Sequence, residues 1–242
     1  MTVLVISDIH SNLTALEAVL EEAGSYDSVW CLGDVVGYGP DPNQCVERVR
    51  DLPELACLRG NHDSAVTGLA EKAKFNPTAQ EALEWTEKEL HASNLTFIKD
   101  LPSHLEKGEV TLAHGSPRDP VWEYIMDPYT ATANFDFFST PYCLVGHSHI
   151  PFLYAYEDGE ELVVRKPLPL GEEVQLPERA LLNPGSVGQP RDNDPRASYA
   201  MFDPEERTWI HCRVAYDVAA VQQRMRDAGL PLNYIQRIAH GW

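Results

Sequence analysis

The chain has 242 residues and carries 37 Asp and Glu against 19 Lys and Arg, which gives a formal net charge of −18. This length allows one large domain with a sizeable core, and such an acidic surface disfavours long nucleic acid because it repels phosphate backbones. No apolar run reaches the roughly 18 residues of a membrane helix, and the opening MTVLVIS indicates a strand, not a signal peptide. We therefore expect a cytoplasmic protein that binds neither membranes nor long nucleic acid.

The first 65 residues repeat a pattern of apolar strand, polar or glycine-rich loop and amphipathic helix. Strands are predicted at Val3–Ile6, at Val29–Leu32 and near Leu55–Leu58; helices are predicted from about Leu13 to Ala23, with Asn12 as the cap, and near Asn43–Asp51. Strands that alternate with helices in this way indicate a parallel α/β sheet.

The next segment, from 65 to 101, has a helical pattern, with Asn76 as a cap and Pro77 in the first turn. Strands are then predicted at 109–114 and 143–149, and after Pro151 two antiparallel hairpins turn around Asp158–Gly159 and Asp203–Glu206. The last 25 residues again look helical. With no repeat or linker, we predict a single domain over 1–242, in which the insertion at about 65–100 could cap a site.

The five cysteines are odd in number, are widely spaced and include no CxxC pair. Three of them, Cys31, Cys57 and Cys143, lie in strand-like runs, where buried reduced thiols are expected. A thiolate zinc site is disfavoured because no pair has ligand spacing.

Residues of the types that ligate metals follow the predicted strands in five places. They are Asp8 and His10, then Asp34, then Asn61, His62 and Asp63, then His114, and finally His147 and His149. In open α/β sheets ligands bind outside the carboxyl ends of the strands, so we expect these side chains to converge. The other four histidines, His91, His104, His211 and His240, lie in polar surroundings and are expected at the surface.

Each motif alone is weak, because Asp–x–His and Gly–Asp are common in loops. In GHSH, alternate residues of an extended segment point the same way, so His147 and His149 are expected to face one centre. Imidazole, carboxylate and carboxamide donors together suit Mn, Fe, Zn, Co or Ni. Two such ions roughly 3.5–4 Å apart need a bridging group, and a carboxylate with two oxygens can provide one.

The ordered set DxH, GD, GNHD, H and GHxH resembles the calcineurin-like metallophosphoesterase superfamily over nearly the whole chain. The stretches SDIHSN, GDVVGYGPDP and NPGSVGQPR are similar to its smaller bacterial and archaeal branch of phosphodiesterases and diadenosine-tetraphosphatase-like proteins. The resemblance implies a four-layer α/β/β/α sandwich with two mixed sheets and a dinuclear metal site at the strand ends.

The resemblance also implies roles for the motif residues. One ion would be held by Asp8, His10 and His149, the other by Asn61, His114 and His147, with Asp34 bridging and manganese favoured. Asn61 and His62 would meet the phosphate; His62 would act as general acid, oriented by Asp63, while metal-activated water attacks phosphorus in line.

The second motif departs from the GDxxDR often found in the family, because it reads Gly33–Asp34–Val35–Val36–Gly37–Tyr38. The arginine of the protein-phosphatase branch is thus replaced by Tyr38, which favours a small phosphodiester or nucleotide-type substrate. The open alternatives are a dinucleoside tetraphosphate hydrolase, a phosphomonoesterase, a nuclease of the same superfamily and a non-catalytic interaction scaffold.

Several residues are candidates for the substrate pocket. Five aromatic residues could stack on a base or pack in the core: Tyr38, Phe75, Trp85, Trp122 and Tyr124. Arg191 or Arg196 could bind a phosphate or form a surface ion pair. No pattern in the sequence indicates an oligomeric state.

Overall fold

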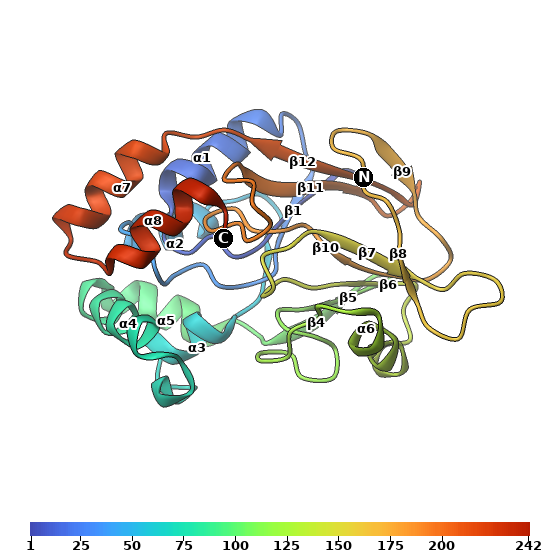
Figure 1. The fold of residues 1–242 in the computed structure, drawn as a ribbon, viewed down its shortest axis with the longest axis horizontal. Coiled ribbons are helices and arrows are strands. Elements are labelled where there is room, and N and C mark those ends of the chain that lie inside the picture. The colour runs from blue at the N-terminus through green and yellow to red at the C-terminus, as the bar shows by residue number, and fades with distance from the viewer.

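In the computed structural model, which describes residues 1–242, two six-stranded sheets pack face to face between layers of helices (Figure 1). The first sheet has the order β3-β2-β1-β11-β12-β9 and consists of β1 (Val3–Ile6), β2 (Ser28–Cys31), β3 (Ala56–Cys57), β9 (Glu173–Gln175), β11 (Ala197–Asp203) and β12 (Thr208–Val214). Strands β1, β2 and β3 run parallel, and β11, β12 and β9 continue the sheet in antiparallel pairs.

The second sheet has the order β4-β5-β6-β10-β7-β8. Its strands are β4 (His104–Lys107), β5 (Val110–Ala113), β6 (Tyr142–Leu144), β7 (Phe152–Ala155), β8 (Val164–Arg165) and β10 (Ala180–Asn183). The inner strands β5, β6 and β10 are parallel, and the outer pairs are antiparallel.

Helices cover both outer faces. They are α1 (Leu13–Glu22), α2 (Pro42–Arg50), α3 (Asn61–Val66), α4 (Pro77–Glu89), α5 (Ala92–Asp100), α6 (Pro128–Asn134), α7 (Val218–Asp227) and α8 (Leu232–His240), with short 3₁₀ turns at Lys72–Lys74 and Phe135–Phe137. In Figure 1 α6 lies beside the second sheet, while the other helices gather at the opposite side of the molecule. No helix is long and apolar enough to cross a bilayer.

The alternation of side chains along β1 shows why the layers form. Val3 and Val5 join the cluster between the two sheets, whereas Leu4 and Ile6 join the cluster under α1 and α2. Both faces of this strand are therefore buried, as a continuous apolar run requires. A third apolar cluster packs α6 on the outer face of the second sheet. The predicted α/β/β/α sandwich is confirmed.

Most of the helices, strands and caps predicted from the sequence are present in the structure. The side chains of Asn12 and Asn76 accept hydrogen bonds from the first turns of α1 and α4, as predicted for caps. Both predicted hairpins form, as the antiparallel pairs β7–β8 and β11–β12. Cys31, Cys57 and Cys143 are buried free thiols.

Strand β10 was missed by the sequence analysis, although it lies in the middle of the second sheet. Its four residues, Ala180–Asn183, are too few to show a period, and Pro184 follows them directly. It pairs parallel with β6. The expectation that all strands after Pro151 pair antiparallel is therefore wrong for β10. The short edge strands β4 and β9 were missed as well.

The expectation of a surface position is wrong for His211. This side chain lies on β12, is 6% exposed and shares a hydrogen bond of 2.9 Å with Ser198 Oγ. Burial, and secondarily the Arg213 charge, lowers the pKa of His211 to about 4. The imidazole is therefore neutral in the native protein at neutral pH. The other three histidines of that group, His91, His104 and His240, are exposed as expected.

This burial predicts an acid-sensitive contribution to stability. The pKa of His211 is about 4 in the native state and ordinary when unfolded, so the unfolded chain binds the extra proton as pH falls below about 6.5. We expect wild-type protein to lose about 3 kcal/mol more unfolding free energy than His211→Gln between pH 7 and pH 4. Urea unfolding at several pH values measures the difference. Equal pH dependence in the two proteins would contradict the assignment.

Candidate metal centre

Seven potential metal ligands converge where the parallel strands end. Asp8 and His10 follow β1, Asp34 follows β2, Asn61 begins α3 after β3, His114 follows β5, and His147 and His149 follow β6. Each of the seven side chains is 3% exposed or less. The two sheets thus contribute ligands to one buried place, because both direct the carboxyl ends of their parallel strands toward it.

The loops that carry these residues have unusual backbone conformations. Asp8, His10, Asp34, His147 and His149 all have φ between 49° and 63°, in the left-handed region that side chains disfavour. Seven of the ten non-glycine residues with positive φ lie in these loops. Backbone strain of this kind is held in place by the surrounding structure and concentrates at functional sites.

Four histidines are each fixed by one ring nitrogen on a backbone carbonyl. The Nδ1 atoms of His10, His114 and His149 lie 3.2, 2.9 and 2.5 Å from the carbonyl oxygens of Val36, Leu32 and Gln189. For His147 it is Nε2 that lies 3.2 Å from the carbonyl oxygen of Trp122. When these N–H groups donate, the other nitrogen of each ring is left as a free acceptor that points at the centre, the arrangement typical of metal-ligating histidines.

The free donor atoms form two groups. In the first, His149 Nε2 lies 3.3 Å from Asp8 Oδ1 and 3.1 Å from His10 Nε2. In the second, His114 Nε2 lies 3.1 Å from Asn61 Oδ1 and 3.2 Å from His147 Nδ1. Donors that share one ion at about 2.1 Å lie roughly 3.0–3.4 Å apart. These four distances fall in that range, while His10 Nε2 and Asp8 Oδ1 lie further apart, at 3.9 Å, so both groups come close to the spacing that a shared cation requires.

Asp34 joins the two groups through a single oxygen. Its Oδ2 lies 3.7 Å from His10 Nε2 and 3.4 Å from His114 Nε2. Its Oδ1 accepts a hydrogen bond of 2.9 Å from the backbone N–H of His62. The expected bridge through both oxygens is therefore replaced by an arrangement in which only Oδ2 faces both groups.

Gly60 makes this position of Asp34 possible. A Cβ at residue 60 would lie 2.0 Å from Asp34 Oδ1, so any side chain there would displace the carboxylate. The glycine of the GNHD motif is thus required by close approach.

The chemistry of the buried oxygens fits a cation. Asp8 Oδ1 and Asp34 Oδ2 are both buried without any hydrogen-bond partner, and both face imidazole nitrogens. Burying an unpaired carboxylate oxygen costs several kcal/mol. A divalent ion in each group would satisfy these oxygens and the histidine lone pairs together, so the residues present fit two metal ions.

Three of the four histidines of the cluster are neutral, as metal ligands must be, and the fourth carries a proton. Burial lowers the pKa of His10, His147 and His149 well below the ordinary value, which leaves these rings neutral. Although burial opposes its charge, the carboxylate of Asp34 raises the pKa of His114 to about 9. Without a cation, a proton on His114 therefore balances Asp34, and metal binding has to displace it.

For the GHSH motif, we expected His147 and His149 to face one centre because alternate residues of an extended segment point the same way, and this reason is wrong. His147 and His149 do not face one centre as alternate residues of a strand, because β6 ends at Leu144 and both residues have left-handed backbones. His149 joins Asp8 and His10, whereas His147 joins Asp34 and His114. The turn separates the two side chains, and each reaches a different group.

His62 lies against the cluster, within 4.8 Å of donor atoms of both His10 and Asp34. Its ring centroid is 4.3 Å from that of Tyr38 and 4.9 Å from that of Phe75, and its Nδ1 is buried with no partner. Burial lowers the pKa of His62 to about 4, so the ring is neutral before an anion binds.

The expected role of Asp63 is wrong. Its carboxylate accepts hydrogen bonds from the backbone N–H groups of Val35, Val36 and Gly60, at 3.2, 3.1 and 3.0 Å, and makes none with His62. Asp63 instead ties the loop that carries Asp34 to the start of α3, so it positions the motifs without orienting the imidazole.

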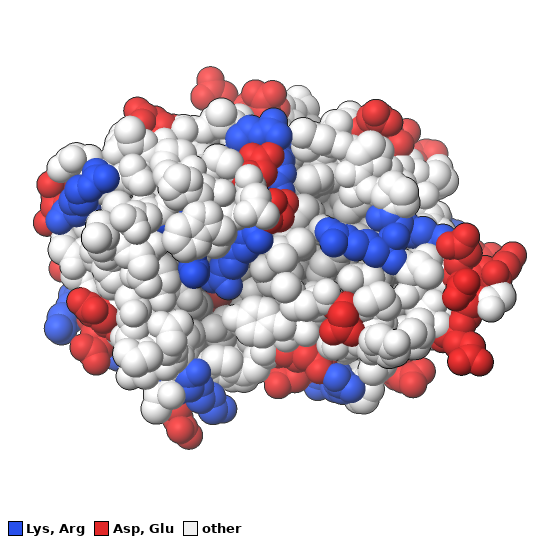
Figure 2. Space-filling view, viewed as in Figure 1, with Lys and Arg blue, Asp and Glu red and all other residues white.

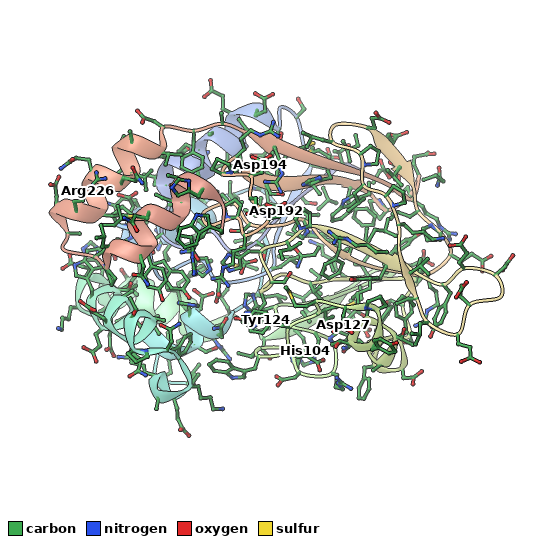
Figure 3. The ribbon with its side chains drawn as sticks, in the orientation of Figure 1. His104, Tyr124, Asp127, Asp192, Asp194 and Arg226 are labelled. Atoms are coloured by element: carbon green, nitrogen blue, oxygen red, sulfur yellow. The ribbon has the colours of Figure 1, made fainter.

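The aromatic residues considered for the substrate pocket differ in how far they are exposed. Tyr38 is only 7% exposed and packs between His10 and Tyr234, and Trp85 packs against the apolar cluster shared by α4, α7 and α8, so neither is open for base stacking. Tyr124 is 47% exposed and stacks on His147 at 3.8 Å between ring centroids; Figure 3 shows it near the middle of the face, where the helical side meets the second sheet.

The two candidate arginines differ as well. Arg196 pairs with Asp194. Arg191 forms no ion pair; its NH2 donates to Gln189 Oε1 at 2.9 Å, and its backbone N–H bonds the carbonyl of His149. Sequence analysis missed Tyr234 and Arg237 of α8, which border the same site, because the last helix carried no recognisable motif.

Comparison with known proteins assigns the family. A sequence model of the calcineurin-like phosphoesterase superfamily domain matches residues 1–207. The chain belongs to this superfamily. It is thus a phosphoric ester hydrolase of a metal-dependent family, with clustered His and Asp groups that could bind metal.

Individual relatives cover most of the chain. An uncharacterised protein of Methanocaldococcus jannaschii is 39% identical over 95% of this chain and 93% of its own length. The crystal structure of a metallophosphoesterase from Sphaerobacter thermophilus superposes with a TM-score of 0.92 and 45% identity, covering 100% of this chain and 99% of that one.

Two further relatives have named activities. Phosphodiesterase YfcE of Escherichia coli is 26% identical over 84% of this chain and 88% of its own. The symmetrical bis(5'-nucleosyl)-tetraphosphatase of Thioalkalivibrio sulfidiphilus is 28% identical over 52% of this chain and 48% of its own.

Asp34→Asn tests the shared oxygen. Because Oδ2 of Asp34 faces both groups, the amide should weaken the uptake of both ions by at least about 100-fold, beyond the roughly 10- to 100-fold typical of outer partners of metal ligands. Equilibrium dialysis with elemental analysis measures this loss. Asp158→Asn, which removes the same charge on the exposed β7–β8 connection, should bind metal like the wild type. Loss of only one ion per chain in Asp34→Asn would refute the bridge.

Proposed function

We propose that this phosphoesterase hydrolyses a small phosphodiester or nucleotide-type substrate with two divalent transition-metal ions, of which manganese is the favoured one. The observation that carries the proposal is the pair of buried ligand groups joined by Asp34 Oδ2, with His62 against them. Asp8, His10 and His149 would hold one ion; Asn61, His114 and His147 would hold the other. Such ions supply Lewis-acid stabilisation of the phosphoryl oxygens and activate the attacking water.

The phosphate would lie between the ligand groups and Arg191. The guanidinium of Arg191 has no carboxylate partner, and its charge acts on Asp8, His10 and His62. A charged group held beside the cluster without a counter-ion is suited to a phosphate oxygen. Asn61 and His62 border the same space from the start of α3.

His62 would supply the proton for the leaving oxygen. Its ring is neutral in the free protein, and an anionic phosphate within about 4–6 Å favours the charged ring. The substrate itself would therefore load the general acid. The Nδ1 atom of His62 lies buried against Gly37, so Nε2 is the ring nitrogen that would exchange the proton with the substrate.

The walls of the site suit a small aromatic substrate. Phe75, from the segment 65–100, meets both His62 and Trp122, at 4.9 and 5.2 Å between ring centroids. We assign this segment a wall of the site within one domain over 1–242, because α4 and α5 pack on α2 and α3 and only the turn before α4 reaches the cluster. Trp122 and Tyr124 line the second-sheet side and could stack on a base.

A dinucleoside tetraphosphatase activity is the second candidate, favoured by the tetraphosphatase relative over half of the chain. A long nucleic acid is disfavoured by the charge of −18. A non-catalytic scaffold is disfavoured because all seven ligand positions and His62 are occupied by residues that can act.

His62→Ala tests the acid. We expect the change to spare metal binding and to slow hydrolysis by roughly 100- to 10,000-fold, the usual range for a general acid. The loss should shrink for esters with a nitrophenyl leaving group, which needs little protonation. Rates on a matched series of aryl and alkyl esters measure this. Equal losses for good and poor leaving groups would count against the acid role.

A substrate panel tests the preferred class. We expect kcat/KM at saturating manganese to be higher for bis-nitrophenyl phosphate, cyclic nucleotides or a dinucleoside tetraphosphate than for a phosphopeptide or single-stranded DNA. Steady-state kinetics on all five decide it. If the phosphopeptide or the DNA leads by tenfold, about 1.4 kcal/mol of transition-state stabilisation, the proposed substrate class is wrong.

A further inference from the structure

Two arginines at the rim of the metal centre lack acidic partners. Arg191 follows β10 in the loop beside His149, and Arg237 lies in the last turn of α8. Three other arginines nearby form ion pairs: Arg196 with Asp194, Arg213 with Asp192 and Arg224 with Asp41. In a chain with 37 acidic residues, two guanidinium groups that border the neighbouring rings of Tyr38 and Tyr234 and lack a carboxylate partner indicate a place suited to an anion.

Each of the two side chains also has an unused donor. The Nε atoms of Arg191 and Arg237 are buried and have no hydrogen-bond acceptor. Leaving a buried charged donor unsatisfied is costly. The cost is removed when an acceptor with several oxygens, such as a phosphate, enters between them.

The two arginines lie beside a row of packed rings that begins at the metal centre. The Tyr38 ring is 4.7 Å from that of His10 and 4.4 Å from that of Tyr234. Arg191 lies 6.0 Å over Tyr38, and Arg237 lies 5.5 Å over Tyr234. Arg191 therefore borders the ring that packs on His10, and Arg237 borders the next ring of the row.

The electrostatics agree with this order. The charge of Arg191 lowers the pKa of four cluster histidines. Burial and the charge of Arg191 lower the pKa of Arg237, which has Tyr38, Tyr234 and Tyr124 as its other influential neighbours. Figure 2 shows basic side chains at the hollow beside the end of α8, near the middle of this face.

We infer that Arg237, together with Arg191, forms a second anion subsite one phosphate beyond the scissile one, so that the enzyme selects substrates with two linked phosphates. This inference rests on the proposed function and specifies its substrate class. Arg237 is a specificity residue supplied by α8, which lies outside the segment 1–207 that matches the family.

The test compares one and two phosphono groups. Methylphosphonate and methylenediphosphonate carry only P–C bonds at the relevant positions, so neither is hydrolysed, and their binding to manganese-loaded protein is measured by calorimetry. Replacing Arg237 by Gln should weaken the diphosphonate by about 10- to 100-fold, the effect of one hydrogen bond to a charged group. Methylphosphonate, held at the metals, should change less than about threefold.

Two further variants keep the test interpretable. Arg226→Gln removes the same charge on the outer side of α7, where Figure 3 shows Arg226 far from the centre, and should bind both ligands like the wild type. Arg237→Lys keeps the charge without the fork and should retain part of the diphosphonate affinity. If Arg237→Gln unfolds, as thermal unfolding would show, the comparison is read from Arg237→Lys.

The outcomes separate this inference from the proposed function. Unchanged binding of both ligands in the Arg237 variants, or an equal loss for both, overturns the second subsite. Selective loss of the diphosphonate supports it, even if the wild-type protein hydrolyses none of the phosphoesters in the panel. If the wild-type protein hydrolyses small phosphoesters but the Arg237 variants show no selective loss of diphosphonate binding, the proposed function stands and the second subsite is refuted.

Discussion

The arrangement of the site depends on the two oxygens of Asp34. One oxygen is held by the backbone N–H of His62, and the other lies between His10 and His114. This division is possible only because Gly60 lets the start of α3 approach the carboxylate. Because Asp34 belongs to the first sheet and His114 to the second, the same contact joins the two halves of the centre.

The four histidines of the candidate metal centre are oriented by the same kind of hydrogen bond. Each of the four candidate ligand histidines donates one N–H to a main-chain carbonyl, and those carbonyls belong to neighbouring loops. Ring orientation is therefore set by backbone packing, which the left-handed conformations at five ligand positions make possible. The cost of this strain and of the buried carboxylates is offset by the well-packed cores on both faces of the first sheet and, by our proposal, by bound cations.

Charge is distributed unevenly around the centre. The chain as a whole is acidic, yet the basic side chains of Arg191 and Arg237 lie over the rings of Tyr38 and Tyr234 beside the ligand groups. By our proposal, the acidic exterior would repel large polyanions, while the basic rim would attract a small one. The C-terminal hairpin of α7 and α8 packs on Tyr38 and α4, so it builds this rim from residues far from the metal motifs.

Apolar runs followed by polar residues identify the strand ends, so the residue pattern predicted that seven side chains converge: Asp8, His10, Asp34, Asn61, His114, His147 and His149. The sandwich of two sheets was implied by the resemblance of the ordered motifs to the family. The motif resemblance implied that His149 joins Asp8 and His10 and that His147 joins the other group, but the sequence did not show the left-handed turn that separates the two side chains, because such a turn leaves no periodic signal. Nor could it show that Asp63 holds backbone, that His211 is buried or that β10 completes the second sheet. Those features, and the placement of Arg191 and Arg237 beside the neighbouring rings of Tyr38 and Tyr234, depend on packing between residues far apart in the chain, which the local sequence does not encode.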